Sequence, residues 1–108
     1  MKIKVNISMR STDVHADAIY EGESITVLPG GTISEDFAAH IKGGTKAKKY
    51  RENPEYVGAD RTILKACQFT SPSTAAQFVT GRSTNGYEAW KVEKKKNLGA
   101  YLKEQGLR

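Results

Sequence analysis

The residues best suited to chemistry lie in GRSTNGYEAWKVEKKK, positions 81–96. This stretch contains the only tryptophan, a tyrosine and five of the seventeen basic residues of the chain. Lysine and arginine neutralise the phosphates of a nucleic acid, and an aromatic ring can stack on an unpaired base. These residue types therefore favour binding of a polyanion.

Most side chains in this stretch also have a structural interpretation. We assign Trp90 to the core, because burying an indole stabilises a small protein strongly. Tyr87 can pack or, if exposed, stack on a base. Asn85 begins an Asn-Gly turn signal, although an asparagine amide can also pair with adenine. Arg82 and Ser83 follow a predicted helix end, where a cation is favoured, so a structural role and a phosphate contact both stay open.

The lysines that follow can extend the same surface. Lys94–Lys96 form a predicted turn that is either simply solvated or part of the contact surface. Arg51 and its neighbouring lysines can add to the positive charge. The candidate nucleic-acid-binding residues are accordingly Arg82, Ser83, Asn85, Tyr87, Lys91, Lys94, Lys95, Lys96, Lys46, Lys48 and Lys49.

Positive charge is concentrated in the second part of the chain. Residues 1–44 hold four basic and six acidic side chains, a net charge of −2, whereas residues 45–108 hold thirteen and six, a net charge of +7. A basic face on a domain with a pI near 9.4 is typical of proteins that bind nucleic acid. We therefore expect a nucleic acid as the partner.

Metal, redox and cofactor chemistry are not expected. Cys67 and the two histidines, His15 and His40, do not have the spacing of a metal site. A single cysteine in an apolar stretch is predicted to be a small core residue. We expect no cofactor and no metal ion.

Enzymatic activity is not expected either. The carboxylates of Asp13, Asp17, Glu21 and Glu23 gather near one predicted hairpin. None of them lies next to a phosphate-binding loop, a histidine pair or a nucleophile motif, and acidic hairpin tips are often only solvated.

The chain is long enough for one domain, and we expect residues 1–108 to form it as a monomer. No apolar run approaches the ~20 residues that span a bilayer. The N-terminal residues alternate charged with apolar side chains, unlike a signal peptide. We therefore expect a cytoplasmic protein without membrane contact.

Strands dominate the predicted first part of the chain. Residues 2–8 alternate with period two, and residues 14–20 and 24–28 flank a connection at 21–23 that contains glycine. Ser34 is a predicted N-cap for a short helix that ends before Gly43. Residues 45–57 are polar and contain Pro54, so a helical turn at 46–52 and an ordered loop both stay open.

The second part alternates strands with capped helices. Residues 62–69 are predicted as a strand covered on both sides, and 87–93 as the last strand. Ser71, Pro72 and Gly81 mark a helix at both ends. Leu98, Tyr101 and Leu102 have the spacing of a final helix that ends at Gly106. The predicted fold class is α+β, a mostly antiparallel sheet of about five strands with two or three short helices packed on it.

One string also resembles a known family. FTSPSTAA at 69–76, GRS at 81–83, NGY at 85–87 and WK at 90–91 look like the signature of an uncharacterised domain family often appended to GIY-YIG nucleases. Residues 16–32 resemble that family's N-terminal hairpin. The serine-rich helix start, the aromatic turn and the tryptophan are also similar to the RAMA domain, associated with restriction enzymes and adenine methylases.

The resemblance implies a role beside nucleases or methylases, and recognition of modified DNA. The leading prediction is therefore a non-catalytic DNA-binding module that senses modified bases or assists a restriction system. The alternative is a protein-interaction adaptor that docks to a nuclease or methylase through an exposed apolar patch.

Overall fold

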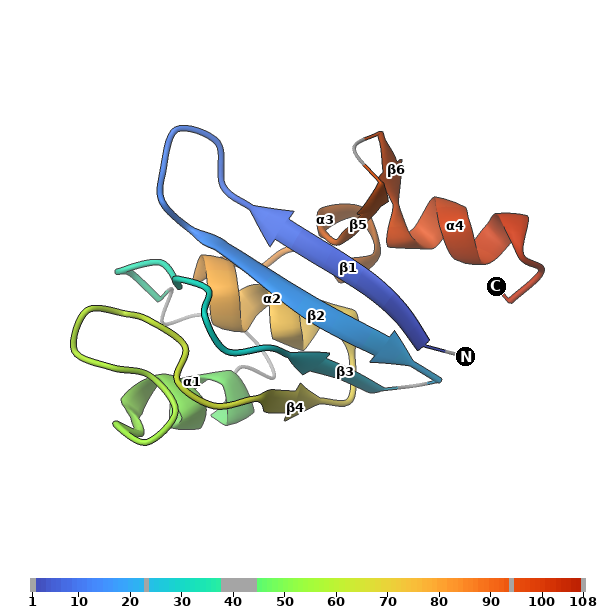
Figure 1. The fold of residues 1–108 in the computed structure, drawn as a ribbon. Helices are drawn as coiled ribbons and strands as arrows, with labels where there is room; N and C mark the ends of the chain where they lie inside the picture. The colour runs from blue at the N-terminus through green and yellow to red at the C-terminus, as the bar shows by residue number, and fades with distance from the viewer. Residues whose placement is uncertain (1, 23, 38–44, 94, 108) are drawn as a thin grey trace.

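The chain folds into one antiparallel sheet with helices packed against it (Figure 1). The computed structural model describes residues 2–22, 24–37, 45–93 and 95–107. Within these ranges the strand order is β4-β3-β2-β1-β5-β6. The strands are β1 (Lys2–Ser8), β2 (His15–Glu21), β3 (Ser24–Val27), β4 (Cys67–Phe69), β5 (Lys91–Glu93) and β6 (Lys96–Asn97). The helices are α1 (Thr45–Glu52), α2 (Pro72–Thr80), α3 (Gly86–Ala89) and α4 (Leu98–Glu104). The predicted α+β class is confirmed.

The first three strands follow directly from the sequence pattern. Ile3, Val5 and Ile7 of β1 are buried and the residues between them are exposed, as period-two alternation requires. β1 pairs with β2 along its whole length. Gly22 adopts a φ of 61° in the β2–β3 connection, a conformation that glycine reaches without steric cost. The predicted meander is confirmed, and its hairpin is tighter than expected because Glu21 pairs with Ser24.

Helix α2 covers the buried face of the sheet and has the predicted boundaries (Figure 1). The Ser71 side chain accepts a hydrogen bond from the Thr74 N–H, and Pro72 occupies the first turn. Gly81 ends the helix with a φ of 71°. A Cβ at Gly81 would lie 1.8 Å from the Asp36 carbonyl oxygen, so the helix end is also closely packed.

The core lies between α2 and the sheet. Its largest fully buried side chains are Trp90, Phe69 and Phe78. Trp90 Nε1 donates a hydrogen bond of 3.0 Å to the Pro72 carbonyl, which satisfies its one polar group. Cys67 is also fully buried, and burial raises the pKa of its thiol to about 12. The predictions that Trp90 and Cys67 are core residues are confirmed.

The strand predicted at 87–93 is wrong over its first part. Residues 86–89 form α3, and only Lys91–Glu93 is a strand. The Asn85 side chain accepts from the Tyr87 N–H and caps α3, so the Asn-Gly pair starts a helical turn here. Gly86 packs so closely on α2 that a Cβ would lie 2.1 Å from the Pro72 carbonyl carbon. This contact with α2 favours a helical turn over an extended strand.

The strand predicted at 62–69 is shorter than expected. Thr62 and Ile63 make only isolated bridges, and β4 is confined to Cys67–Phe69. Leu64 and Ala66 are exposed, so the prediction that both faces of this run are covered is wrong. Helix α2 lies on the opposite face of the sheet, so it does not cover these two side chains (Figure 1).

The two uncertain segments between β3 and β4 have different outcomes. Of the alternatives at 46–52, the helix is present as α1. The helix predicted from Ser34 is not present at residues 34–37. There the Ser34 hydroxyl donates a hydrogen bond of 2.8 Å to the Asp36 carbonyl. The rest of the predicted helix lies outside the described residues. In the parts of the chain that the structure describes, no helix is long and apolar enough to cross a membrane.

Candidate nucleic-acid interface

The connection between α2 and β5 contains several of the predicted contact residues. Hydrogen bonds fix this connection near both of its ends. After Gly81 turns the chain, the Thr80 hydroxyl accepts from the Arg82 N–H at 3.3 Å and donates to the Ala76 carbonyl at 2.8 Å. Farther along, the Gly86 N–H donates to the Ser73 hydroxyl at 3.0 Å. Both ends of the connection are therefore tied to α2, which fixes the residues between them.

Three predicted contact residues line one open cavity of about 320 Å³. Arg82, Ser83 and Lys91 meet there with side chains from the end of β1. We call this cavity the Arg82 groove. Its lining residues are Ile7, Ser8, Met9, Thr80, Arg82, Ser83, Thr84, Ala89 and Lys91.

The two cations of the Arg82 groove differ in the interactions that hold their side chains. Lys91 Nζ donates to the Glu88 carbonyl at 3.0 Å, which holds the ammonium group beside α3. The Arg82 side chain is exposed and makes no ion pair among the described residues. Two cations and the Ser83 hydroxyl in one hollow are a set of groups that can bind a phosphate.

Two other predicted residues, Asn85 and Tyr87, lie outside the Arg82 groove. They line a second cavity of about 410 Å³, which we call the Tyr87 groove. Its lining residues are Asn85, Tyr87, Glu88, Asn97, Gly99, Ala100 and Lys103. Tyr87 is half-buried and packs against the core. Its side chain is therefore neither fully packed in the core nor fully exposed for stacking on a base.

Lys103 and Asn97 belong to the Tyr87 groove and were missed by the sequence reasoning. Lys103 lies in the last turn of α4, and the Asn97 side chain caps that helix by accepting from the Ala100 N–H at 2.8 Å. Lys103 is exposed, whereas Leu98 and Leu102 of the same helix are buried. Its position next to Tyr87 depends on the docking of α4 against α3, which no local pattern shows.

Of the lysines predicted to form a turn before α4, Lys95 and Lys96 line neither groove, and Lys96 lies in β6 rather than in a turn. Lys96 Nζ lies 2.7 Å from Glu104 Oε2, and this hydrogen bond to Glu104 raises the pKa of Lys96. The ion pair ties β6 to α4. Lys95 is exposed, and Lys94 lies outside the described residues.

The predicted lysines of α1 lie at the other edge of the sheet (Figure 1). Lys46 Nζ is 6.0 Å from the centroid of the Phe69 ring on β4. Lys48 pairs with Glu52 across one helical turn at 3.9 Å, and Lys49 is exposed. The structure therefore divides the candidate residues into one group around α3 and another on α1.

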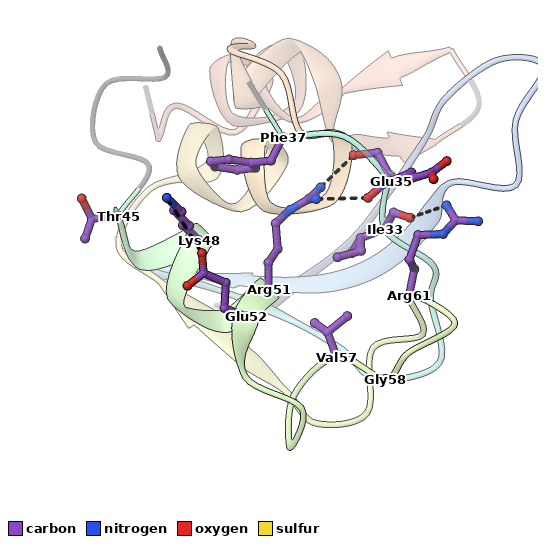
Figure 2. Close-up of a pocket in the computed structure, with 11 residues that line it drawn as sticks. Ile33, Glu35, Phe37, Thr45, Lys48, Arg51, Glu52, Val57, Gly58 and Arg61 are labelled. Atoms are coloured by element: carbon purple, nitrogen blue, oxygen red, sulfur yellow. Dashed lines mark hydrogen bonds and ion pairs between the residues drawn. The ribbon is translucent and has the colours of Figure 1, made fainter. Parts of the chain in front are cut away.

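A cavity of about 620 Å³ lies beside α1 (Figure 2). Its walls come from α1, from the segment Ile33–Phe37 and from the turn at Val57–Arg61. Arg61 holds two of these walls together, because its guanidinium donates to the Ile33 carbonyl at 3.0 Å and lies 3.6 Å from Asp13 Oδ2.

Arg51 crosses the inner wall of this cavity and acts as a structural cation. Its guanidinium donates to Ser34 O at 3.0 Å and Ser34 Oγ at 2.7 Å, and to the carbonyls of Phe78 at 2.9 Å and Val79 at 3.4 Å. The last two carbonyls end α2, where a cation is favoured. Burial lowers the pKa of Arg51 to about 10, and the nearby Asp36 carboxylate opposes that shift.

The charges around this large cavity are balanced. Arg51 is bound to carbonyls, Arg61 pairs with Asp13, and Lys48 pairs with Glu52. Glu35 adds another negative side chain to the lining. The cavity therefore lacks the excess positive charge that binding of a polyanion requires. Nor does the described part of the chain contain a cluster of His, Cys, Asp or Glu residues suited to a metal ion.

Fold and site together define a small α+β domain whose sheet is covered on one face and whose grooved, basic edge surrounds α3. The chain belongs to the family of a domain of unknown function, DUF4357, whose model matches residues 6–102. The match begins within β1 and ends within α4, so it includes both edges of the sheet. Comparisons with curated proteins and with solved structures found no match. The predicted membership of an uncharacterised family is confirmed, and the link to GIY-YIG nucleases or RAMA domains stays a prediction.

Proposed function

We propose that this domain is a non-catalytic DNA-binding module that contacts phosphates through the groove beside α3. The observation that carries the proposal is the meeting of Arg82, Lys91 and Ser83 in the Arg82 groove. Arg82 and Ser83 come from the end of α2 and Lys91 comes from β5, so the tertiary fold brings the groups together. Two cations and a hydroxyl form a suitable site for a backbone phosphate.

The distribution of charge supports the same proposal. Residues 45–108 carry a net charge of +7, and both grooves beside α3 belong largely to that part of the chain. The α1 edge also contains lysines and arginines, but those in its large cavity are balanced by carboxylates and carbonyls. The α3 edge is therefore the better site for the polyanion.

A nuclease or restriction system is the biological setting that the family resemblance favours. The strings FTSPSTAA, GRS and NGY are similar to domains appended to GIY-YIG nucleases and to the RAMA domain. In such a setting the module would act in the cytoplasm and hold a catalytic partner on DNA, with a modified base as a further determinant. Comparison of methylated with unmethylated duplex tests that last point.

A fluorescence-anisotropy titration over a series of salt concentrations tests the proposed function. We expect affinity for labelled DNA to fall as salt rises, because bound lysines and arginines release counterions. The Arg82→Ala variant should weaken binding and lower the slope of log K against log salt by about one, as the loss of one phosphate contact predicts. Amide signals of Arg82, Ser83 and Lys91 should shift in NMR spectra as DNA is added.

The proposal is wrong if duplex, methylated duplex and single-stranded DNA all leave those NMR signals unchanged and show a flat titration. An unchanged salt slope in Arg82→Ala, with DNA still bound, would move the site away from the Arg82 groove.

An adaptor function is the second candidate; the exposed face of β1 and β2, rather than the apolar patch expected from the sequence, favours it. Lys2, Lys4 and Asn6 of β1 are exposed there, next to Asp17 and Glu21 of β2. This mixed, nearly neutral surface suits a protein partner better than a nucleic acid. Co-purification of a defined GIY-YIG nuclease or adenine methylase at high salt, abolished by Lys4→Glu, would support an adaptor.

A further inference from the structure

Two hollows lie beside α3, because residues of this helix line both of them. The Arg82 groove measures about 320 Å³ and the Tyr87 groove about 410 Å³. Both volumes fall in the range of roughly 300–1,000 Å³ that is usual for small-ligand pockets, so each can hold a group of nucleoside size. Ala89 lines the first groove and Glu88 the second, which makes α3 the wall between them.

Helix α3 itself is poorly suited to entering the major groove of a duplex. It has only four residues, and Glu88 is its one exposed side chain. Duplex readers insert a protruding helix or a two-stranded ribbon, and insertion of α3 would bring a carboxylate between two rows of phosphates. The cations lie in the hollows beside α3, where a single flexible strand can reach them.

The Tyr87 groove is rich in hydrogen-bond donors because two asparagines serve as helix caps. Asn85 Oδ1 accepts from the Tyr87 N–H at 3.0 Å, and Asn97 Oδ1 accepts from the Ala100 N–H at 2.8 Å. Each cap occupies the amide oxygen and leaves the NH₂ group without a hydrogen bond to another described residue. The Lys103 ammonium adds further donors at the rim.

Base edges offer the matching acceptors. Every nucleobase carries ring nitrogens or carbonyl oxygens, but pairing occupies one edge of each base in a duplex. An unpaired base can turn out of the stack, pack on an aromatic side chain and present that edge to protein donors. Tyr87 supplies the aromatic wall of the groove.

We infer that this site binds a single-stranded nucleic acid, with its phosphates along the Arg82 groove and one unpaired base in the Tyr87 groove. Lys103 and the capping amides of Asn85 and Asn97 donate to that base or to its adjoining phosphate. The inference rests on the proposed function and goes beyond it, because it selects the form of the nucleic acid and adds contact residues on α4. An unpaired DNA strand and an RNA strand offer the same chemistry.

The test compares three labelled probes of one sequence at one salt concentration: a 12-nucleotide DNA strand, the same strand as RNA, and the DNA duplex. We expect at least one single strand to bind about ten-fold more tightly than the duplex, because stacking and base-edge contacts are added to phosphate contacts. Lys103→Ala should weaken single-strand binding roughly five-fold and leave the weaker duplex binding unchanged.

Lys49→Ala is the matched control variant, because Lys49, although a candidate from the sequence, lies on α1 and lines neither groove. Lys49 and Lys103 are both exposed lysines in the last turn of a helix, at opposite edges of the sheet. Lys49→Ala should bind single strands as the unchanged protein does, and melting temperatures of both variants verify that each is folded.

The possible outcomes separate the inference from the proposed function. Duplex binding as tight as single-strand binding overturns the inference and leaves the proposed function standing. Equal single-strand affinity of Lys103→Ala and the unchanged protein overturns the assignment of the Tyr87 groove. Absence of binding to all three probes overturns the proposed function as well.

Discussion

The two edges of the sheet contain similar basic residues that the fold uses differently. At the α1 edge, Lys46 lies over Phe69, Lys48 pairs with Glu52, and Arg51 binds the carbonyls that end α2. At the α3 edge, Arg82, Lys95 and Lys103 make no ion pair with another described residue. Most basic residues at the α1 edge stabilise the fold, whereas these three at the α3 edge remain accessible to a ligand. Lys49 and Lys96 are the exceptions, because Lys49 is exposed and makes no ion pair with a described residue, and Lys96 pairs with Glu104. Positive charge in a sequence therefore does not by itself locate a binding surface.

Arg51→Ala gives the largest expected effect and tests whether the α1 edge is structural. The substitution removes four hydrogen bonds and the contact of the guanidinium with Phe37, whose ring centroid lies 4.9 Å away. We expect the free energy of unfolding to fall by about 3 kcal/mol, because buried carbonyls lose a charged donor. Urea denaturation measures this loss.

The Arg51→Lys variant is the control for charge. An ammonium group cannot reproduce the planar set of donors, so it should recover only a small part of the stability. Full recovery would mean that the charge of Arg51 matters and its geometry does not.

Gly86→Ala tests how α3 is held at the opposite edge. The new methyl group would meet the Pro72 carbonyl carbon at 2.1 Å, and backbone must move to admit it. We expect a loss of about 2 kcal/mol in the free energy of unfolding. Gly58→Ala is the matched control, since its methyl group would meet the Asp60 side chain at 3.1 Å, where a side chain can adjust. Equal losses in the two variants would contradict close packing of α3 on α2.

Glu104→Gln tests the short ion pair between Lys96 and Glu104 near the α3 edge. The pair raises the pKa of Lys96, so its stabilising effect should be full below the ordinary lysine pKa of 10.5 and disappear as pH rises through the higher folded value. We expect the substitution to lower stability slightly at neutral pH and to have no effect in strongly alkaline solution. Thermal unfolding at several pH values measures the difference, and a difference that grows with pH would contradict the assignment.

Lys49→Ala should give the smallest effect on stability. Lys49 is exposed on α1 and makes no ion pair with a described residue. We expect a change of under about 0.5 kcal/mol in the free energy of unfolding. A clear loss of DNA affinity in this variant would extend the binding surface to the α1 edge and weaken the contrast between the edges.

Much of the fold was predictable from the sequence where interactions between residues close in the chain determine the structure. The alternation of Ile3, Val5 and Ile7 predicts β1 because successive side chains of a strand point to opposite faces. Ser71 and Gly81 predict both ends of α2 because helix caps involve groups within a few residues. These predictions hold because no distant contact competes with them.

The candidate site was predictable only in part. An Asn-Gly pair suits both a hairpin turn and the start of a helical turn, and the contact of Gly86 with Pro72 selects the helical one. The alternation at 87–93 is too short to exclude a helical turn. Lys103 was missed because its proximity to Tyr87 arises from the packing of α4 on α3.

By itself, the sequence determined the strands of the meander, both caps of α2, the excess of positive charge after residue 44 and the family signature. Only the tertiary structure decided which cations serve the fold and which line a groove. A side chain carries its charge wherever it lies, but its surroundings come from distant segments. Arg51 binds the Phe78 carbonyl, and Lys103 lines one groove together with Tyr87. Access to a ligand is therefore a property of the packed chain.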